Sequence, residues 1–342
     1  MKTLKIFILI AVFCLISIIL SKWIKWDGLE VSDPKWVWIH SKIFNSPRQT
    51  VDYVFIGSSR TWCGVKAKQI ENAFPGIKVW NFGRHWTGRD IDYLIIKDLL
   101  EHHDVKHIFV EIIGKETFSA HSYAKFIMPP DEAVQEARFL LKDLTLKDIL
   151  TYSFNLKERM KHITNQMVEL SLRFYRTLCF SAWKNFLAKM DDTADLVSHD
   201  ATGGFYVDDA QLTQNPELAE QFGRFQPFYP VGKGPYLLPE GTFPDYYLNK
   251  IHKICQLHHT ELSFVFISGY VSVLPNDQMF HYFHRWGELY IPTLRNIYKM
   301  EYWRDKNHVY QKGAEVFTDE IISLLKNGVE SSEDYRQYIQ KP

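Results

Sequence analysis

Asp305 and His308 stand three residues apart in the stretch YWRDKNHVYQKGAEVF, just ahead of an amphipathic helical pattern. A carboxylate and an imidazole in one short turn can act as a pair, in which the carboxylate orients the imidazole and the imidazole takes a proton. Such a pair needs a nucleophile, and this stretch contains no serine. A D-x-x-H spacing also arises by chance, so the pair gains meaning only if the fold brings a serine to it.

The serine is expected at the end of a strand. The run VDYVFIGSS predicts a buried strand that closes on small residues, with Ser58 and Ser59 directly after Gly57. In an open parallel sheet the site lies beyond the carboxyl ends of the strands, and the helix that follows offers backbone N–H groups to an oxyanion. Taken alone, a Gly-Ser turn is more often a helix cap than a nucleophile.

Alternating strand and helix patterns surround these residues. Strands are expected at 51–59, 75–83, 105–113, 262–269 and 288–292, and helices at 65–74, 88–103, 246–259 and 313–327. This alternation predicts an α/β fold with a five-stranded parallel sheet, arranged as a flavodoxin-like three-layer sandwich.

The pattern divides the chain into an α/β domain, expected at 51–113 and 246–328, and an interruption over 114–245. The interruption begins with helical patterns and ends in a long segment rich in Gly, Pro and aromatic residues. We expect a helical insertion followed by a loop with a binding or lid role. Residues 27–50 read as a linker, and 329–342 as a C-terminal tail.

The N-terminal 26 residues predict a membrane anchor. The run IFILIAVFCLISIILS carries no charge and is followed by KWIKW, whose lysines and aromatic residues suit a membrane interface. No small-x-small cleavage site follows, which favours an uncleaved signal anchor. The flanking charges favour an extracytoplasmic position for the large domain.

Charge and cysteine content exclude several classes of partner. Lys plus Arg and Asp plus Glu number 40 each among 342 residues, so no basic excess points to nucleic acid. The cysteines form no C-x-x-C pair, and no metal or other cofactor is expected. A disulfide between Cys179 and Cys255 is conceivable, but no pattern supports it.

The joint order of the motifs resembles the SGNH, or GDSL, hydrolase superfamily. The resemblance rests on Gly-Ser-Ser after the first strand, NFG after the second, and DKNHVYQKGAEVFTDEI around the last helix. It covers about 51–111 and 262–325. It implies Ser59 as nucleophile, His308 as base and Asp305 as orienter, with Ser58 in place of the family's usual aspartate.

The resemblance also implies an oxyanion hole. The Ser59 amide would act with a glycine amide from NFGRHWTG, either Gly83 or Gly88. The asparagine that many members carry after the third strand is absent from VEIIGKETF, where Glu111 or Lys115 could project toward the site but a solvated loop charge is the favoured interpretation.

Two further residues beside the expected nucleophile are candidates for substrate binding, Arg60 and Trp62. Arg60 could hold an anionic group or pair with an acid, and the sequence favours neither. His85, near the second turn, reads more simply as structural than as catalytic.

Three functions remain open. The resemblance extends to membrane-tethered members of this superfamily that modify alginate or teichoic acid. It implies O-acylation of a cell-surface polysaccharide, most simply O-acetylation, as the leading expectation, in cooperation with a polytopic membrane acyltransferase. The same triad would serve an esterase that deacylates a glycan or lipid. The missing third-block asparagine leaves a non-catalytic assembly or polymer-binding subunit as the third reading.

Overall fold

The computed structural model describes residues 34–85, 88–112, 116, 121, 128–129, 132, 135–136, 139, 242–270, 275, 277–292, 297 and 299–327. The chain divides into two compact units, one of Trp38–His121 with Thr193–Pro342 and one of Met1–Val37 with Ser122–Asp192. The first unit holds the sheet and the predicted triad.

Five strands, all parallel, form one sheet in the order β2-β1-β3-β4-β5. The strands are β1 (Thr50–Gly57), β2 (Val79–Gly83), β3 (Asp104–Ile112), β4 (Glu261–Phe266) and β5 (Glu288–Tyr290). Their inner residues are almost continuously apolar and buried, as strands covered on both faces require. The predicted five-stranded parallel α/β sheet is confirmed.

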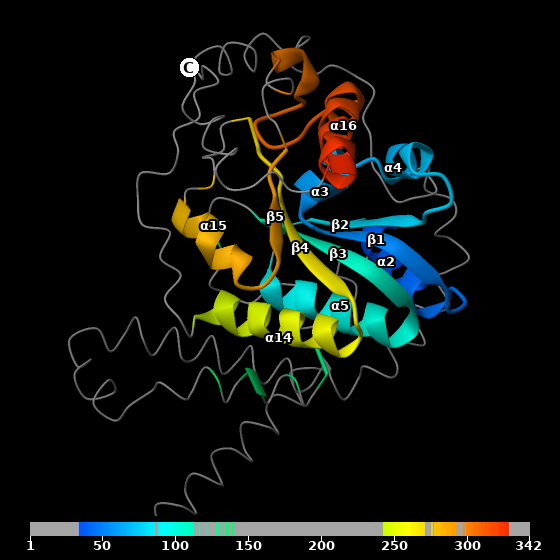
Figure 1. Ribbon diagram of the computed structural model, residues 1–342, viewed down its shortest axis with the longest axis vertical. Helices are drawn as coiled ribbons and strands as arrows, with labels where there is room; N and C mark the ends of the chain where they lie inside the picture. Colours follow the sequence, from blue (N-terminus) through cyan, green and yellow to red (C-terminus); the bar gives the residue numbers. More distant parts are fainter. Residues whose placement is uncertain are drawn as a thin grey trace, which may run out of the picture. The chain divides into compact units, whose positions relative to one another are not determined.

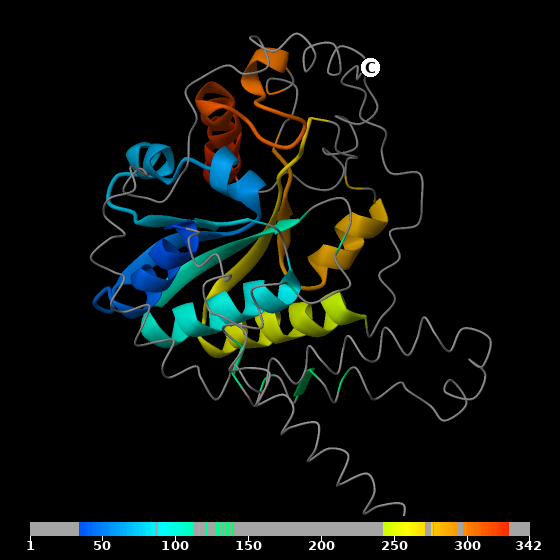
Figure 2. The ribbon, with the colours of Figure 1, turned by 180° about the vertical axis from the view of Figure 1, so that it is seen from behind.

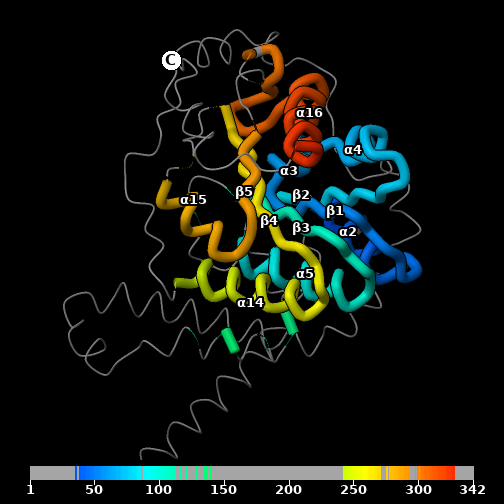
Figure 3. Tube along the Cα trace, in the orientation of Figure 1, coloured from blue at the N-terminus to red at the C-terminus, as the bar shows by residue number. Residues whose placement is uncertain are grey.

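Helices cover both faces of this sheet (Figures 1 and 2). Helices α5 and α14 pack together on one face, and α3, α4 and α16 lie on the other. The bounds are α3 (Ser59–Gly64), α4 (Ala67–Ala73), α5 (Arg89–His102), α14 (Phe243–Leu257), α15 (Asp277–His284) and α16 (Gln311–Asn327). Figure 3 shows that α3, near the start of the chain, lies beside α16, near its end.

Three of the helices differ from the expectation. Helix α2 (Pro34–Phe44) occupies part of the segment expected as a linker, because Ile39 and Ile43, four residues apart, bury one side of it. Helices α3 and α15, of six and eight residues, were not among the helices expected from the sequence.

The remaining predicted segments fall mostly outside the described residues. The expected anchor at 1–26, the tail at 329–342 and nearly all of 114–245 belong to this part of the chain. Within the described residues, no helix combines the length and apolar character needed to cross a membrane.

The strand register brings three residues to one level at the carboxyl edge of the sheet. Gly57 pairs with Gly83, and Ile56 pairs with Val110, so Glu111 lies level with Gly57. A Cβ on Gly83 would stand 2.7 Å from Trp62 Cα, because the end of β2 packs directly against the backbone of α3. The absence of a side chain there lets α3 approach the sheet.

At the other end of the strands, a buried histidine makes stability depend on pH. His107 stacks on Phe109, and its Nε2 lies 2.8 Å from Ser263 Oγ. Burial lowers the pKa of His107 to about 4. Since the unfolded chain titrates near 6.5, it binds more protons than the folded chain below that pH, and stability falls as the pH falls from about 6.5 to about 4.

We expect His107 to account for a loss of about 2 kcal/mol in the free energy of unfolding between pH 7 and pH 5. Urea titrations of the wild-type protein and of His107→Gln at both pH values would measure this, and the variant should lose correspondingly less. Equal pH dependence in the two proteins would contradict the assignment.

Candidate active site

Ser59 and His308 meet at the carboxyl edge of the sheet although they are 249 residues apart in the chain. Ser59 is the first residue of α3, directly after β1, and His308 lies in the segment ahead of α16. Ser59 Oγ is 2.7 Å from His308 Nε2. The structure therefore brings the predicted nucleophile within hydrogen-bond reach of the predicted base.

Asp305 holds the other side of the imidazole. Its Oδ2 and Oδ1 lie 2.8 Å and 3.0 Å from His308 Nδ1. A carboxylate only accepts hydrogen bonds, so Nδ1 carries the proton and Nε2 is left to accept from Ser59. This is the tautomer that general-base catalysis requires.

Asp305 stays ionised in this arrangement. Burial works against its charge, but the hydrogen bonds from His308 and from the Asn307 amide outweigh that effect and lower the pKa of Asp305. The Asn307 amide donates to Asp305 Oδ1 at 2.7 Å, and the His308 amide donates to the same oxygen at 3.1 Å. One carboxylate thus orders the whole D-x-x-H turn.

The turn is closed by backbone contacts on either side. Trp303 and Val309 form an antiparallel bridge, and the Arg304 amide donates to the His308 carbonyl at 2.8 Å. Trp303 is fully buried, and its indole N–H donates to the Ile297 carbonyl at 2.7 Å. A Cβ on Gly313 would approach Val309 Cβ to 3.0 Å, so a glycine here lets α16 pack close to the turn.

Glu111 is buried beneath the nucleophile turn, with 1% of its surface exposed. Its carboxylate accepts from the Ser58 amide at 2.6 Å, from Ser58 Oγ at 2.8 Å and from Thr61 Oγ1 at 2.5 Å. The interpretation of Glu111 as a solvated loop charge is therefore wrong. Its signal in the sequence was a single carboxylate inside the otherwise apolar run IFVEII, which must find donors when it is buried.

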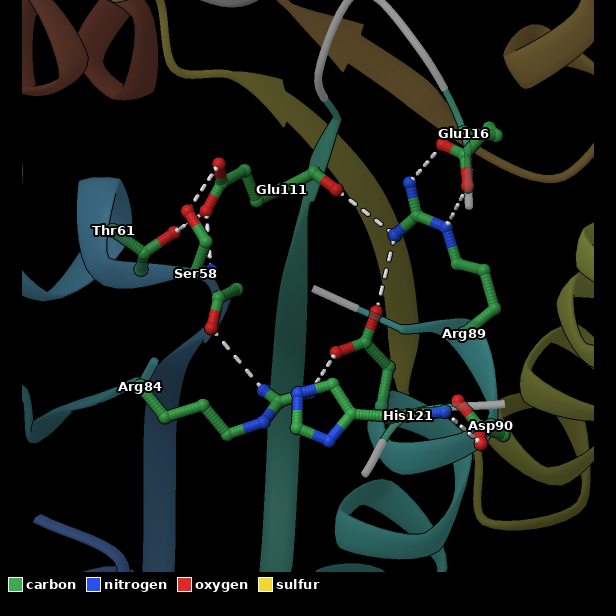
Figure 4. A network of polar contacts seen from close by, with 10 residues as sticks. Ser58, Thr61, Arg84, Arg89, Asp90, Glu111, Glu116 and His121 are labelled. Atoms are coloured by element: carbon green, nitrogen blue, oxygen red, sulfur yellow. Dashed lines mark hydrogen bonds and ion pairs between the residues drawn. The ribbon is translucent and has the colours of Figure 1, made fainter. Parts of the chain in front are cut away.

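A buried ionic network fixes the ends of the central strands (Figure 4). Arg84 donates to the Gly57 carbonyl at 3.2 Å and to Asp92 at 2.6 Å. Arg89 donates to the Glu111 carbonyl at 2.9 Å and pairs with Asp92 at 3.2 Å and with Glu116. The two arginines therefore connect the carboxyl ends of β1 and β3 to α5.

The candidate oxyanion donors differ in their availability. The Ser59 amide has no hydrogen-bond acceptor among the described residues, as the first amide of a helix often does not. The Gly83 amide already donates to Asn81 Oδ1 at 2.9 Å. Gly88 is buried at the N-cap of α5. Unlike the Gly83 amide, the Gly88 amide does not donate to Asn81, so Gly88 is the better candidate of the two glycines for an oxyanion donor.

The two candidate substrate-binding residues lie in different environments. Arg60 is half-buried and donates to Asn307 Oδ1 at 2.8 Å, which links the nucleophile helix to the D-x-x-H turn. Trp62 points into the interior, with 6% of its surface exposed, and packs edge-on against His85 at 5.2 Å between ring centroids. The structure therefore places Arg60, and not Trp62, at an accessible position beside Ser59.

Two of the residues considered in the sequence, Lys115 and Cys179, lie outside the described residues. Cys255 is a buried free thiol, and burial raises its pKa to about 12. Across the residues that the structure describes, no cluster of three or more His, Cys, Asp or Glu could hold a metal ion.

The chain matches no protein-family model, and its sequence has no significant match among curated proteins.

Proposed function

We propose that this protein is an extracytoplasmic O-acyltransferase, with acetyl as the expected acyl group, that modifies a cell-surface polysaccharide through an acyl-enzyme on Ser59. The observation that carries the proposal is the 2.7 Å contact between Ser59 Oγ and His308 Nε2, with Asp305 bound to the other imidazole nitrogen. A serine hydroxyl becomes an effective nucleophile near neutral pH when a base is placed in this way.

Each half-reaction uses the same proton carrier. Ser59 Oγ attacks the carbonyl carbon of the acyl donor while its proton moves to His308 Nε2, and the leaving group departs with that proton. The acyl group then remains on Ser59 as an ester. A hydroxyl of the acceptor gives its proton to His308 and attacks this ester, and Ser59 regains the proton as the acylated acceptor leaves. Asp305 stabilises the imidazolium in both steps.

We also propose that the chain belongs to the SGNH superfamily, and the fold supports this. The order β2-β1-β3-β4-β5 is the strand order of flavodoxin-like sheets, whose ligands bind beyond the carboxyl ends of the strands. Ser59, Asp305 and His308 lie in that region. The uncharged run of residues 6–21 supports a domain tethered outside the membrane, where a polytopic acyltransferase could supply the acyl group.

Hydrolysis is the second candidate, because water can reach the triad. The His308 and Asp305 side chains remain 26% and 37% exposed, so the acyl-enzyme would be open to attack by water as well as by a sugar hydroxyl. The formed triad favours either enzyme over a non-catalytic scaffold, since a scaffold has no need of an oriented Ser59–His308 contact.

A fluorophosphonate probe tests whether the site is active. We expect a single adduct on the peptide that contains Ser59, located by tandem mass spectrometry after incubation with the folded protein. Failure of the folded protein to take up the probe would refute both enzymatic functions and leave the scaffold.

Transfer and hydrolysis then separate with p-nitrophenyl acetate as donor. Transfer predicts that an added polysaccharide accelerates the release of p-nitrophenol and becomes acetylated. Hydrolysis predicts that p-nitrophenol is released at the same rate with and without the polysaccharide, and that the polysaccharide stays unmodified.

A further inference from the structure

We infer that Glu111 is a positioning residue for the Ser59 nucleophile, holding the turn that carries Ser59 where its hydroxyl reaches His308. The inference rests on the proposed function of Ser59. Glu111 makes no hydrogen bond to Ser59 itself but binds Ser58, the preceding residue, and Thr61, two residues further along. Figure 4 shows the Glu111 side chain directed at both.

The three hydrogen bonds restrain the turn at two separate points. Ser58 is held through its amide and its hydroxyl, so both its backbone and its side-chain rotamer are fixed. Thr61, one helical turn later, is held through its hydroxyl. Ser59 lies between these points, and its backbone can shift only if at least one contact to Glu111 is lost.

The short helix α3 needs such external support. It has six residues, and an isolated helix of that length is not stable in water. Ser58 is its N-cap, and the Ser58 hydroxyl accepts from the Arg60 amide at 3.1 Å while it donates to Glu111. The carboxylate thus fixes the capping group that starts the helix on which Ser59 stands.

The surroundings of Glu111 are built to accept it. A Cβ on Gly57 would stand 2.5 Å from Glu111 Cβ, so only glycine leaves room for this side chain beneath the turn. Glu111 is the acceptor in all three contacts, and the two oxygens of a carboxylate have the lone pairs to accept them. Arg89 donates to the Glu111 carbonyl at 2.9 Å and holds the backbone from which the side chain extends.

A purely structural role would lower stability and leave the reactivity of the folded protein unchanged, so the test measures both. The rate constant for fluorophosphonate labelling reports the nucleophile without any need for a natural substrate, and thermal unfolding reports stability. The variants are Glu111→Ala, which removes all three acceptor contacts, and Glu111→Gln, which keeps the shape and an acceptor oxygen.

We expect labelling of folded Glu111→Ala to slow by about 100-fold, since a displacement of about 1 Å at a reacting group has effects of that size. Glu111→Gln should retain a rate within about tenfold of wild type. Its amide oxygen can still accept from the Ser58 amide and the Thr61 hydroxyl, and its NH₂ group can donate to Ser58 Oγ. The control is Ser263→Ala, which loses a buried hydroxyl bonded to His107 far from the turn. It should lower stability and label at the wild-type rate.

A second pair of variants carries the test if Glu111→Ala does not fold. Ser58→Asp keeps a good N-cap but sets a second carboxylate against Glu111, and we expect it to slow labelling about 100-fold. The double variant Ser58→Asp/Glu111→Gln removes the repulsion and should recover at least tenfold of that loss.

The outcomes separate the inference from the function on which it depends. A wild-type protein that takes no label on Ser59 overturns the proposed function and the inference with it. Labelling of wild type together with an equal rate for folded Glu111→Ala, or with no recovery in the double variant, overturns the positioning role alone. Slow labelling of Glu111→Ala with recovery in Glu111→Gln supports it.

Discussion

Replacing Ser59 by alanine should reduce the acetyl content of the surface polysaccharide to the level of cells that lack the protein. The alanine has no oxygen to form the ester, and the base at 2.7 Å then has no hydroxyl to activate. Ser59 is half-exposed, so the loss of its hydroxyl should leave stability almost unchanged. The measurement is the acetate released by mild alkali from purified polymer, compared across complemented cells.

The matched control is Ser323→Ala, which removes an exposed hydroxyl from α16 far from the reacting atoms. It should restore wild-type acetylation at equal protein level. If Ser59→Ala cells produced polymer with full acetyl content, O-acylation through Ser59 would be excluded, whatever the reactivity of the purified protein.

Asp305→Asn is expected to slow both probe labelling and ester cleavage by about 10³-fold to 10⁴-fold, by analogy with the serine protease triad. The amide can donate to His308 Nδ1, which would place the imidazole proton on Nε2 and leave Ser59 without an acceptor. The substitution leaves the size of the side chain unchanged, so the fold should persist.

The pKa of Asp305 defines the range of pH over which this difference should hold. Because the folded-state pKa is lowered, the contribution of the ionised Asp305 is present above the unfolded value of about 3.8 and is lost only as the pH falls through the folded value. The ratio of wild-type to variant rates should therefore not decline between pH 6 and pH 5 through titration of Asp305.

Asp319→Asn is the control for the loss of a carboxylate, since Asp319 is exposed on α16 and accepts from Gln69 at 2.6 Å away from the turn. It should label at the wild-type rate. An Asp305→Asn protein that labels within about threefold of wild type would show that the histidine does not depend on Asp305 for its tautomer.

The features that could be predicted from the sequence are those that depend on local residue patterns, such as apolar runs and helical periodicity. The central strands are long apolar runs, and α5, α14 and α16 carry a helical stripe, so their existence and order were predictable. Asp305 and His308 could be paired because their geometry is set within one turn. Ser59 could be joined to them because parallel strands bring their carboxyl ends to one edge.

The supports of the site were not predictable in the same way. Glu111 is recognisable only when β1 and β3 are in register, because its donors come from another strand's turn. The pairing of Arg84 and Arg89 with Asp92 likewise depends on how α5 lies against the sheet. Such residues have no periodic signature, and their role follows from the burial of a charge that must find partners.

The separation of Ser59 and His308 along the chain also governs when the site can exist during synthesis. A ribosome releases the nucleophile, its turn and Glu111 early, but the base and its carboxylate emerge only with the segment that leads into α16. A nascent chain that ends before residue 300 therefore lacks the two residues that would accept and hold the Ser59 proton. The proposed acyl-enzyme chemistry therefore requires the segment that leads into α16, the helix that contacts α3 in the folded protein.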